Sequence, residues 1–210
     1  SYINNKKGTF MLNESVFLNN NNFIKNDSVI NSIINNCLFI DSKKGLFFTK
    51  SFNINILNSV FLNNNNTVVI EKENSGYFKF FNNLFLNNKT VINNKDSCQI
   101  YLFNNTFSEN NIVLNSKINK KTYKKLISKN NIYDNNFLNF KLNNYKISHS
   151  YCMSNTDTLK GYYNIFSSPS YIDKNNFNYN LSNKSPGLRS GINNITFGVN
   201  INSINIIKYL

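Results

Sequence analysis

The chain has 210 residues, of which 40% are hydrophobic and 15% aromatic, a content that excludes an intrinsically disordered chain and fits one sizeable domain. No apolar run approaches the roughly 18 residues of a membrane span, so we expect no transmembrane segment. A formal net charge of +13 ordinarily indicates a polyanionic partner. Codon bias and solubility are the preferred explanation here, with a polyanion site as the alternative, because the Lys residues are mostly scattered singly and about a quarter of the chain is Asn.

A seven-residue phrase with a central aromatic residue recurs from the N-terminal region onward. Its clearest copy, NSVFLNN, spans residues 58–64, and the aromatic anchors step by 22, 22, 24, 22 and 26 residues. A near-fixed period of this length is typical of a repeat protein, in which each unit buries its apolar face on its neighbours. The anchors are Phe17, Phe39, Phe61, Phe85, Phe107 and Tyr133.

Two further short apolar runs lie between successive anchors. In the third period these runs are residues 67–70 and 77–81, with a turn signal at residues 74–76 between them. Three short strands per period predict an all-β, single-chain parallel β-helix with about seven rungs, each strand pairing with its equivalent one rung away. We expect the rungs to span residues 1–163 and a capping segment of the same domain to span residues 164–210.

A leucine-rich repeat and a prion-like segment fit the pattern less well. Residues 57–65 fit the leucine-rich-repeat consensus, but other periods place Asn13, Asn35, Ser108 or Asp134 where that consensus requires an apolar residue. The Asn-rich runs at residues 19–22 and 63–66 resemble a prion-like segment, yet the periodic aromatic anchors argue against low complexity.

Asn recurs three positions before the anchor, and we expect this column to hydrogen-bond from rung to rung and to satisfy buried backbone groups. Its members are Asn36, Asn58, Asn82, Asn104 and Asn130.

The residues on either side of the anchor are apolar in four rungs. Successive side chains of a strand point to opposite faces, so the neighbours of an inward-pointing anchor point outward. Stacked over four rungs, these neighbours form an apolar stripe on the surface. Monomers rarely expose such a stripe, so we expect the C-terminal tail, a further domain or a protein partner to cover it. The apolar stripe comprises Val16, Leu18, Leu38, Ile40, Val60, Leu62, Leu84 and Leu86.

The insertion at residues 116–129 is the one dense basic patch. Within it, Lys120, Lys121, Lys124 and Lys125 are candidate ligands for an acidic polysaccharide or another polyanion, the alternative being a solvated loop.

Three cysteines, Cys37, Cys98 and Cys152, show neither a CxxC pair nor metal-ligand spacing. We interpret them as small buried residues within strands, leave open one accidental disulfide, and predict no metal site and no cofactor.

The region after residue 160 resembles the end of a right-handed parallel β-helix of the pectate-lyase-like superfamily. Many bacterial members carry a Pro-x-Phe-x-Asp segment, a Tyr-x-Leu strand and a Ser-Pro-x-x-x-x-Gly turn after the last coil. Pro169, Tyr171 and Asp173 match the first, Tyr179 and Leu181 the second, and Ser185, Pro186 and Gly191 the third. The chain departs from the pattern at Gly187 and Arg189, where members commonly carry Ala and Asp. The resemblance implies a right-handed coil and an extracellular or cell-surface location, but it does not fix an activity, since this superfamily includes both enzymes and noncatalytic surface proteins.

Candidate catalytic residues are sparse, since the chain holds only ten acidic side chains. Glu109 and Asp134 come from adjacent rungs, one position out of register, and form the one candidate carboxylate pair. His149 has no Ser, Cys or acidic residue arranged beside it as a triad, so we expect it to be a strand or edge residue. A lyase of this superfamily would also call for clustered acidic ligands for calcium.

We therefore predict a noncatalytic, secreted or surface-displayed β-helix that binds glycans or other cell-surface polymers, with a polysaccharide lyase or glycoside hydrolase as the alternative. The two differ in whether one β face gathers two carboxylates with a Lys or Arg. Nucleic acid is not the expected partner, because scattered Lys without a recognised module is a poor signal for it.

Overall fold

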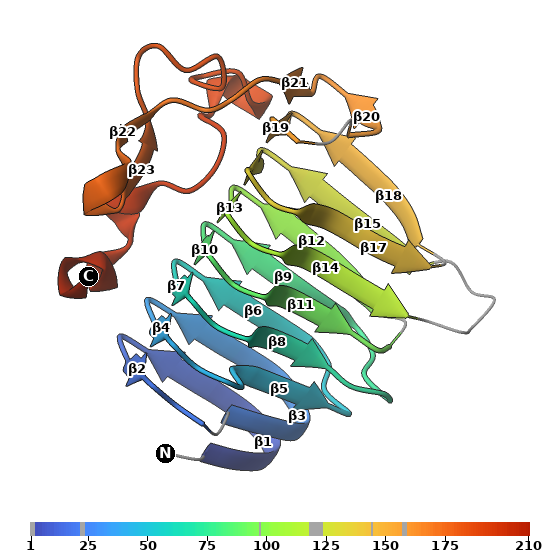
Figure 1. The fold of residues 1–210 in the computed structure, drawn as a ribbon. Helices are drawn as coiled ribbons and strands as arrows, with labels where there is room; N and C mark the ends of the chain where they lie inside the picture. Colours follow the sequence, from blue (N-terminus) through green and yellow to red (C-terminus); the bar gives the residue numbers. More distant parts are fainter. Residues whose placement is uncertain (1–2, 22–23, 97, 118–123, 144, 157–158) are drawn as a thin grey trace.

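The computed structural model describes residues 3–21, 24–96, 98–117, 124–143, 145–156 and 159–210. The chain winds into an all-β, right-handed parallel β-solenoid of about six turns, which confirms the predicted fold class (Figure 1). The apolar core is enclosed by two sheets, and the C-terminal tail folds back along one side of the stack (Figure 1).

One sheet consists of eight short parallel strands that carry the predicted anchors. Each anchor pairs in register with the next, for example Phe61 with Phe85 and Phe85 with Phe107. The strands are β2 (Val16–Leu18), β4 (Leu38–Ile40), β7 (Val60–Leu62), β10 (Leu84–Leu86), β13 (Thr106–Ser108), β16 (Ile132–Asp134), β19 (Met153–Ser154) and β21 (Ile165–Phe166).

The second sheet has thirteen strands and forms the other two sides of each coil. Its long strand β3 (Ile24–Asn35) pairs with β1 (Ile3–Asn13) on one side. On the other side the first half of β3 pairs with β5 and the second half pairs with β6, so the sheet divides into two arms. The first arm contains β5 (Leu46–Thr49), β8 (Asn66–Ile70), β11 (Thr90–Asn94), β14 (Ile112–Lys117) and β17 (Leu138–Asn143). The second arm contains β6 (Asn53–Leu57), β9 (Tyr77–Phe81), β12 (Gln99–Phe103), β15 (Lys124–Lys129), β18 (Tyr145–Ser150) and β20 (Gly161–Tyr162).

The predicted Asn column forms the corner between the second arm and the short strands. Four of its five members have φ between 51° and 55°, and the fifth, Asn58, has φ of 46°. Asn tolerates this left-handed region better than most non-glycine residues do. Some members bond from rung to rung, as Asn82 Nδ2 does to Asn58 Oδ1 (2.8 Å). We call this column the Asn corner.

The buried backbone groups are satisfied one residue later, which differs from the prediction. At the Asn corner, the main-chain N–H of Asn83 donates to Asn105 Oδ1 (3.0 Å), and that of Asn105 donates to Asn131 Oδ1 (2.8 Å). The position after the left-handed residue points inward, where each amide links two rungs. A second buried amide ladder occupies the opposite corner and comprises Asn64, Asn88, Asn110 and Asn136.

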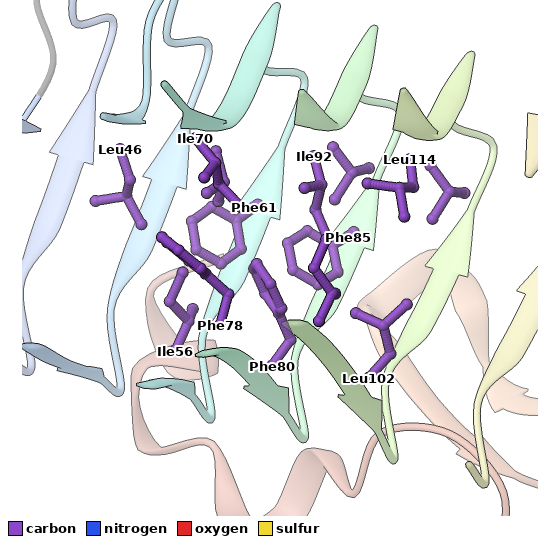
Figure 2. Close-up of a cluster of buried hydrophobic side chains, with 14 of the residues drawn as sticks. Leu46, Ile56, Phe61, Ile70, Phe78, Phe80, Phe85, Ile92, Leu102 and Leu114 are labelled. Carbon is purple, nitrogen blue, oxygen red and sulfur yellow. The ribbon is translucent and has the colours of Figure 1, made fainter. Parts of the chain in front are cut away.

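The core is a stack of the aromatic anchors surrounded by aliphatic and further aromatic side chains from both arms, among them Phe78 and Phe80 (Figure 2). Successive anchors from Phe17 to Tyr133 stack nearly parallel, with ring centroids 4.8 to 5.2 Å apart. That spacing is the rise between strands, so in-register pairing alone produces the stack. Cys37, Cys98 and Cys152 are buried thiols, as expected, and burial raises the pKa of Cys37 to about 11.

The C-terminal tail covers most of the apolar stripe. After the last rung it forms the antiparallel pair of β22 (Tyr171–Asp173) and β23 (Asn178–Leu181), with 3-10 turns η1 (Lys174–Asn176), η2 (Ile192–Asn194), η3 (Ile201–Ser203) and η4 (Asn205–Tyr209). Its apolar residues form one buried cluster with Leu38, Val60, Leu84 and Leu86, whereas Val16 and Leu18 in the first rung stay exposed. The tail residues of this cluster are Tyr179, Val199, Ile201, Ile204 and Ile206.

Gly198 permits the closest approach of the tail to the short strands. It has φ of 77°, and a Cβ there would lie 2.5 Å from Ile132 Cδ1 and 2.6 Å from Thr106 Oγ1. The next main-chain N–H, from Val199, donates to Thr106 Oγ1 (3.1 Å). Within the described ranges, no helix is both long and apolar enough to cross a membrane.

Candidate functional site

The predicted carboxylates come together at the edge of the short-stranded sheet. Asp134 pairs in register with Ser108, which places Glu109 one position beyond it, as predicted. Lys174 from the tail reaches both carboxylates, with its Nζ 2.7 Å from Glu109 Oε1 and 3.6 Å from Asp134 Oδ2. Two carboxylates and a cation on one face is the pattern that a catalytic groove would show.

The surroundings of this pair identify it as a fastening point for the tail. The Asp134 side chain is only 5% exposed and accepts hydrogen bonds from Ser108 Oγ (3.1 Å) and Asn155 Nδ2 (2.8 Å). The Lys174 ammonium also lies 6.0 Å from the ring centroids of both Tyr171 and Tyr179. Burial, followed by the charges of Glu109 and Asp134, raises the pKa of Tyr179, so that its hydroxyl stays protonated. These contacts leave Asp134 enclosed by protein groups and no open position at its carboxylate for a substrate.

Calcium does not fit this cluster. Among the described residues, no group of three or more His, Cys, Asp or Glu side chains could hold a metal ion. Lys174 already supplies the positive charge between Glu109 and Asp134.

The structure describes only part of the predicted basic patch. Lys120 and Lys121 lie outside the described residues, and Lys124 is placed by its backbone at the start of β15, paired with Tyr145. Lys125 is exposed on the outer face of the second arm and pairs with Lys146, which is also exposed. The described part of the patch therefore belongs to a sheet face.

His149 is a strand residue, as expected, and lies inside the last complete rung. It is 3% exposed, and its ring centroid is 4.9 Å from that of Phe140. Burial lowers the pKa of His149 from 6.5 to about 4.

Acidification below pH 6.5 should therefore destabilise the fold through His149. Between pH 6.5 and 4 the unfolded chain binds a proton that the folded chain excludes, so stability is fully present above this window and is lost as the pH falls through it. At pH 5 we expect a loss of about 2 kcal/mol, to be measured by urea unfolding at pH 7 and pH 5. The His149→Phe variant should lose correspondingly less, and an equal loss in both proteins would contradict this prediction.

The outer face of the second arm combines aromatic and basic side chains without a carboxylate. None of β6, β9, β12, β15 and β18, nor the paired segment 31–35 of β3, contains Asp or Glu. Alternation along each strand directs its first, third and fifth residues outward in β9 and β12, as their burial patterns show. We call this surface the aromatic–lysine face; it comprises Tyr77, Phe81, Tyr101 and Phe103 with Lys79, Lys125, Lys129 and Lys146.

The aromatic residues of this face contact one another and a lysine. The rings of Tyr77 and Tyr101 meet edge to face with centroids 6.0 Å apart, and those of Tyr101 and Phe103 lie 5.9 Å apart. Lys79 Nζ lies 5.7 Å from the Phe81 ring centroid. In-register pairing therefore gathers residues about 24 positions apart into one continuous surface.

A cleft of about 660 Å³ separates the Asn corner from the tail. The corner contributes Asn58, Asn82 and Asn104, and the tail contributes the opposite wall, including Ile195 and Thr196. None of the residues that line the cleft is charged. Sequence reasoning missed this cleft, because no local signal shows where the tail returns to the coil.

No protein-family model matches this chain, and neither does any curated protein.

Proposed function

We propose that this protein is a noncatalytic, extracellular or surface-displayed β-solenoid that binds an extended anionic glycan across the aromatic–lysine face. The observation that carries the proposal is the absence of any carboxylate on the six paired strand segments of the second arm, together with four aromatic residues and four lysines.

The chemistry of this face suits a polymer of acidic sugars. Aromatic rings offer flat apolar surfaces to the C–H faces of sugar rings, and Lys ammonium groups supply mobile point charges for carboxylate or sulfate groups. A face without acidic residues does not repel such a chain. Because the rungs repeat about every 4.8 Å, an extended polymer that crosses them meets the rings of β9 and β12 and then the lysines of β15 and β18.

Membership of the pectate-lyase-like superfamily is part of this proposal, and the tail supports it. The matched residues Tyr171 and Tyr179 pack with ring centroids 4.8 Å apart, and the Ser170 N–H donates to Ser185 Oγ (3.3 Å). These contacts give the quoted residues a structural role where the tail folds onto the coil. An extracellular location follows from the same resemblance.

A polysaccharide lyase or glycoside hydrolase is the second candidate, favoured by the meeting of Glu109 and Asp134. We prefer the noncatalytic function because Asp134 is buried and held by Lys174 and two hydrogen bonds, which leaves only Glu109 exposed.

The test is retention on an immobilised uronate polysaccharide, compared with a neutral polysaccharide, over increasing salt concentration. Retention on the uronate should fall with salt. Replacing Lys125 and Lys146 with Gln should weaken it roughly five- to thirty-fold, if each ammonium contributes about 0.5–1 kcal/mol.

The matched control replaces Lys43 and Lys89 with Gln, two exposed lysines that lie after short strands at the opposite corner. It removes the same charge but leaves the face intact, so retention should be nearly unchanged. Equal weakening in both double variants, or no retention of the wild-type protein, would refute the assignment to this face.

A further inference from the structure

We propose that the cleft between the Asn corner and the tail is a separate binding site for a neutral oligosaccharide. It adjoins the aromatic–lysine face only at Phe81 and takes a ligand of different charge, and it stands whether or not that face binds a polymer.

The cleft exists because the tail is fixed to the Asn corner at two separated rungs. At one rung the Asn200 N–H donates to Asn82 Oδ1 (2.6 Å), and Asn82 Nδ2 donates to Ser203 Oγ (2.8 Å). Two rungs further, the Gly198 N–H donates to the Asn130 carbonyl (2.6 Å). Asn104 lies on the rung between these attachments. On that rung the tail is held at Thr106, two residues after Asn104, and Asn104 itself lines the cleft.

The walls offer hydrogen-bond donors that the protein does not use. Among the described residues, neither Asn104 Nδ2 nor Asn202 Nδ2 donates a hydrogen bond, and the Thr196 hydroxyl only accepts one, from the Arg189 N–H (3.4 Å). All three residues line the cleft. An uncharged ligand rich in oxygen acceptors satisfies such donors.

The apolar part of the lining is partly open. Ile172 is 59% exposed, Ile195 is 45% exposed and Phe81 is 39% exposed, and all three border the same cleft. Sugars present this combination of hydroxyl edges and C–H faces, whereas an anionic ligand would find no cation in the lining. The volume of about 660 Å³ lies within the range of roughly 300–1,000 Å³ that is usual for small-molecule sites.

The test is calorimetric titration of the full chain with four neutral trisaccharides, namely triacetylchitotriose, cellotriose, maltotriose and mannotriose. At least one should bind with an affinity that does not change between low and high salt, because no ion pair contributes. Replacing Asn104 with Asp keeps the side-chain shape and the tolerance of positive φ but removes the amide donor. It should weaken binding about tenfold, as should Thr196→Val.

Two controls separate this cleft from the rest of the surface. Asn63→Asp makes the same change at a left-handed residue of the opposite corner, and Lys125→Gln with Lys146→Gln alters only the aromatic–lysine face; both should bind the trisaccharide as the wild-type protein does. The proposal is overturned if none of the four trisaccharides binds, if binding weakens with salt, or if Asn104→Asp and Thr196→Val both bind within about twofold of the wild-type protein while circular dichroism shows them folded.

Discussion

Replacing Phe85 with Ala lowers the free energy of unfolding by about 3–5 kcal/mol, the range for removing a large aromatic side chain from a core. Phe85 is fully buried at the centre of the aromatic stack, with the rings of Phe61 and Phe107 at centroid distances of 4.9 and 5.0 Å. The anchors are held at the strand spacing, so the neighbouring rings cannot collapse into the cavity. Equilibrium unfolding in urea measures the change.

Phe52→Ala is the matched control, since Phe52 is 48% exposed and lies in the turn before β6. We expect a change below about 1 kcal/mol for it. If Phe85→Ala were as mild as this control, the stack would contribute little to the stability of the coil.

Replacing Asn110 with Ala lowers the free energy of unfolding by roughly 3–5 kcal/mol, because it leaves several buried groups without partners at about 1–3 kcal/mol each. The Asn110 Oδ1 accepts from the main-chain N–H of Asn88 (2.9 Å), and its Nδ2 donates to the Phe85 carbonyl (3.0 Å) and to Asn136 Oδ1 (3.0 Å). A buried polar group without a partner costs more than the bond itself contributes.

The adjacent exposed residue provides the comparison. Asn111→Ala changes the same residue type in the same turn, and it should shift stability by less than about 0.5 kcal/mol. Similar losses for Asn110→Ala and Asn111→Ala in thermal or urea unfolding would show that the buried ladder has no special energetic role.

The sequence predicted the coil well, because its evidence is periodic and local. Aromatic anchors such as Phe61 and Phe85 repeat at the pitch of the solenoid, and in-register pairing then fixes which side chains share a column. The Asn corner was also predicted in register, and its rung-to-rung hydrogen bonds occur. The buried backbone groups are satisfied by the next residue instead, because a one-residue offset decides whether an amide points inward. Only the backbone conformation at Asn82 shows that Asn83 carries the buried bonds.

The candidate sites were less predictable, because they depend on contacts between distant parts of the chain. Register alone brought Glu109 close to Asp134, as predicted, but nothing local to the repeat places Lys174 between them. The same holds for the cleft, whose walls join Asn104 to Thr196. The aromatic–lysine face was predicted only in part. Lys125 was predicted from the sequence as a candidate ligand, but none of the aromatic residues of this face was.

The most direct measurement follows both retention and product release when the protein meets a uronate polysaccharide, with and without calcium. The noncatalytic function predicts salt-sensitive retention, with no shorter chains released and no difference between the wild-type protein and Glu109→Gln. Release of shorter products that disappears in Glu109→Gln or Asp134→Asn would contradict it and would make the carboxylate pair a catalytic site.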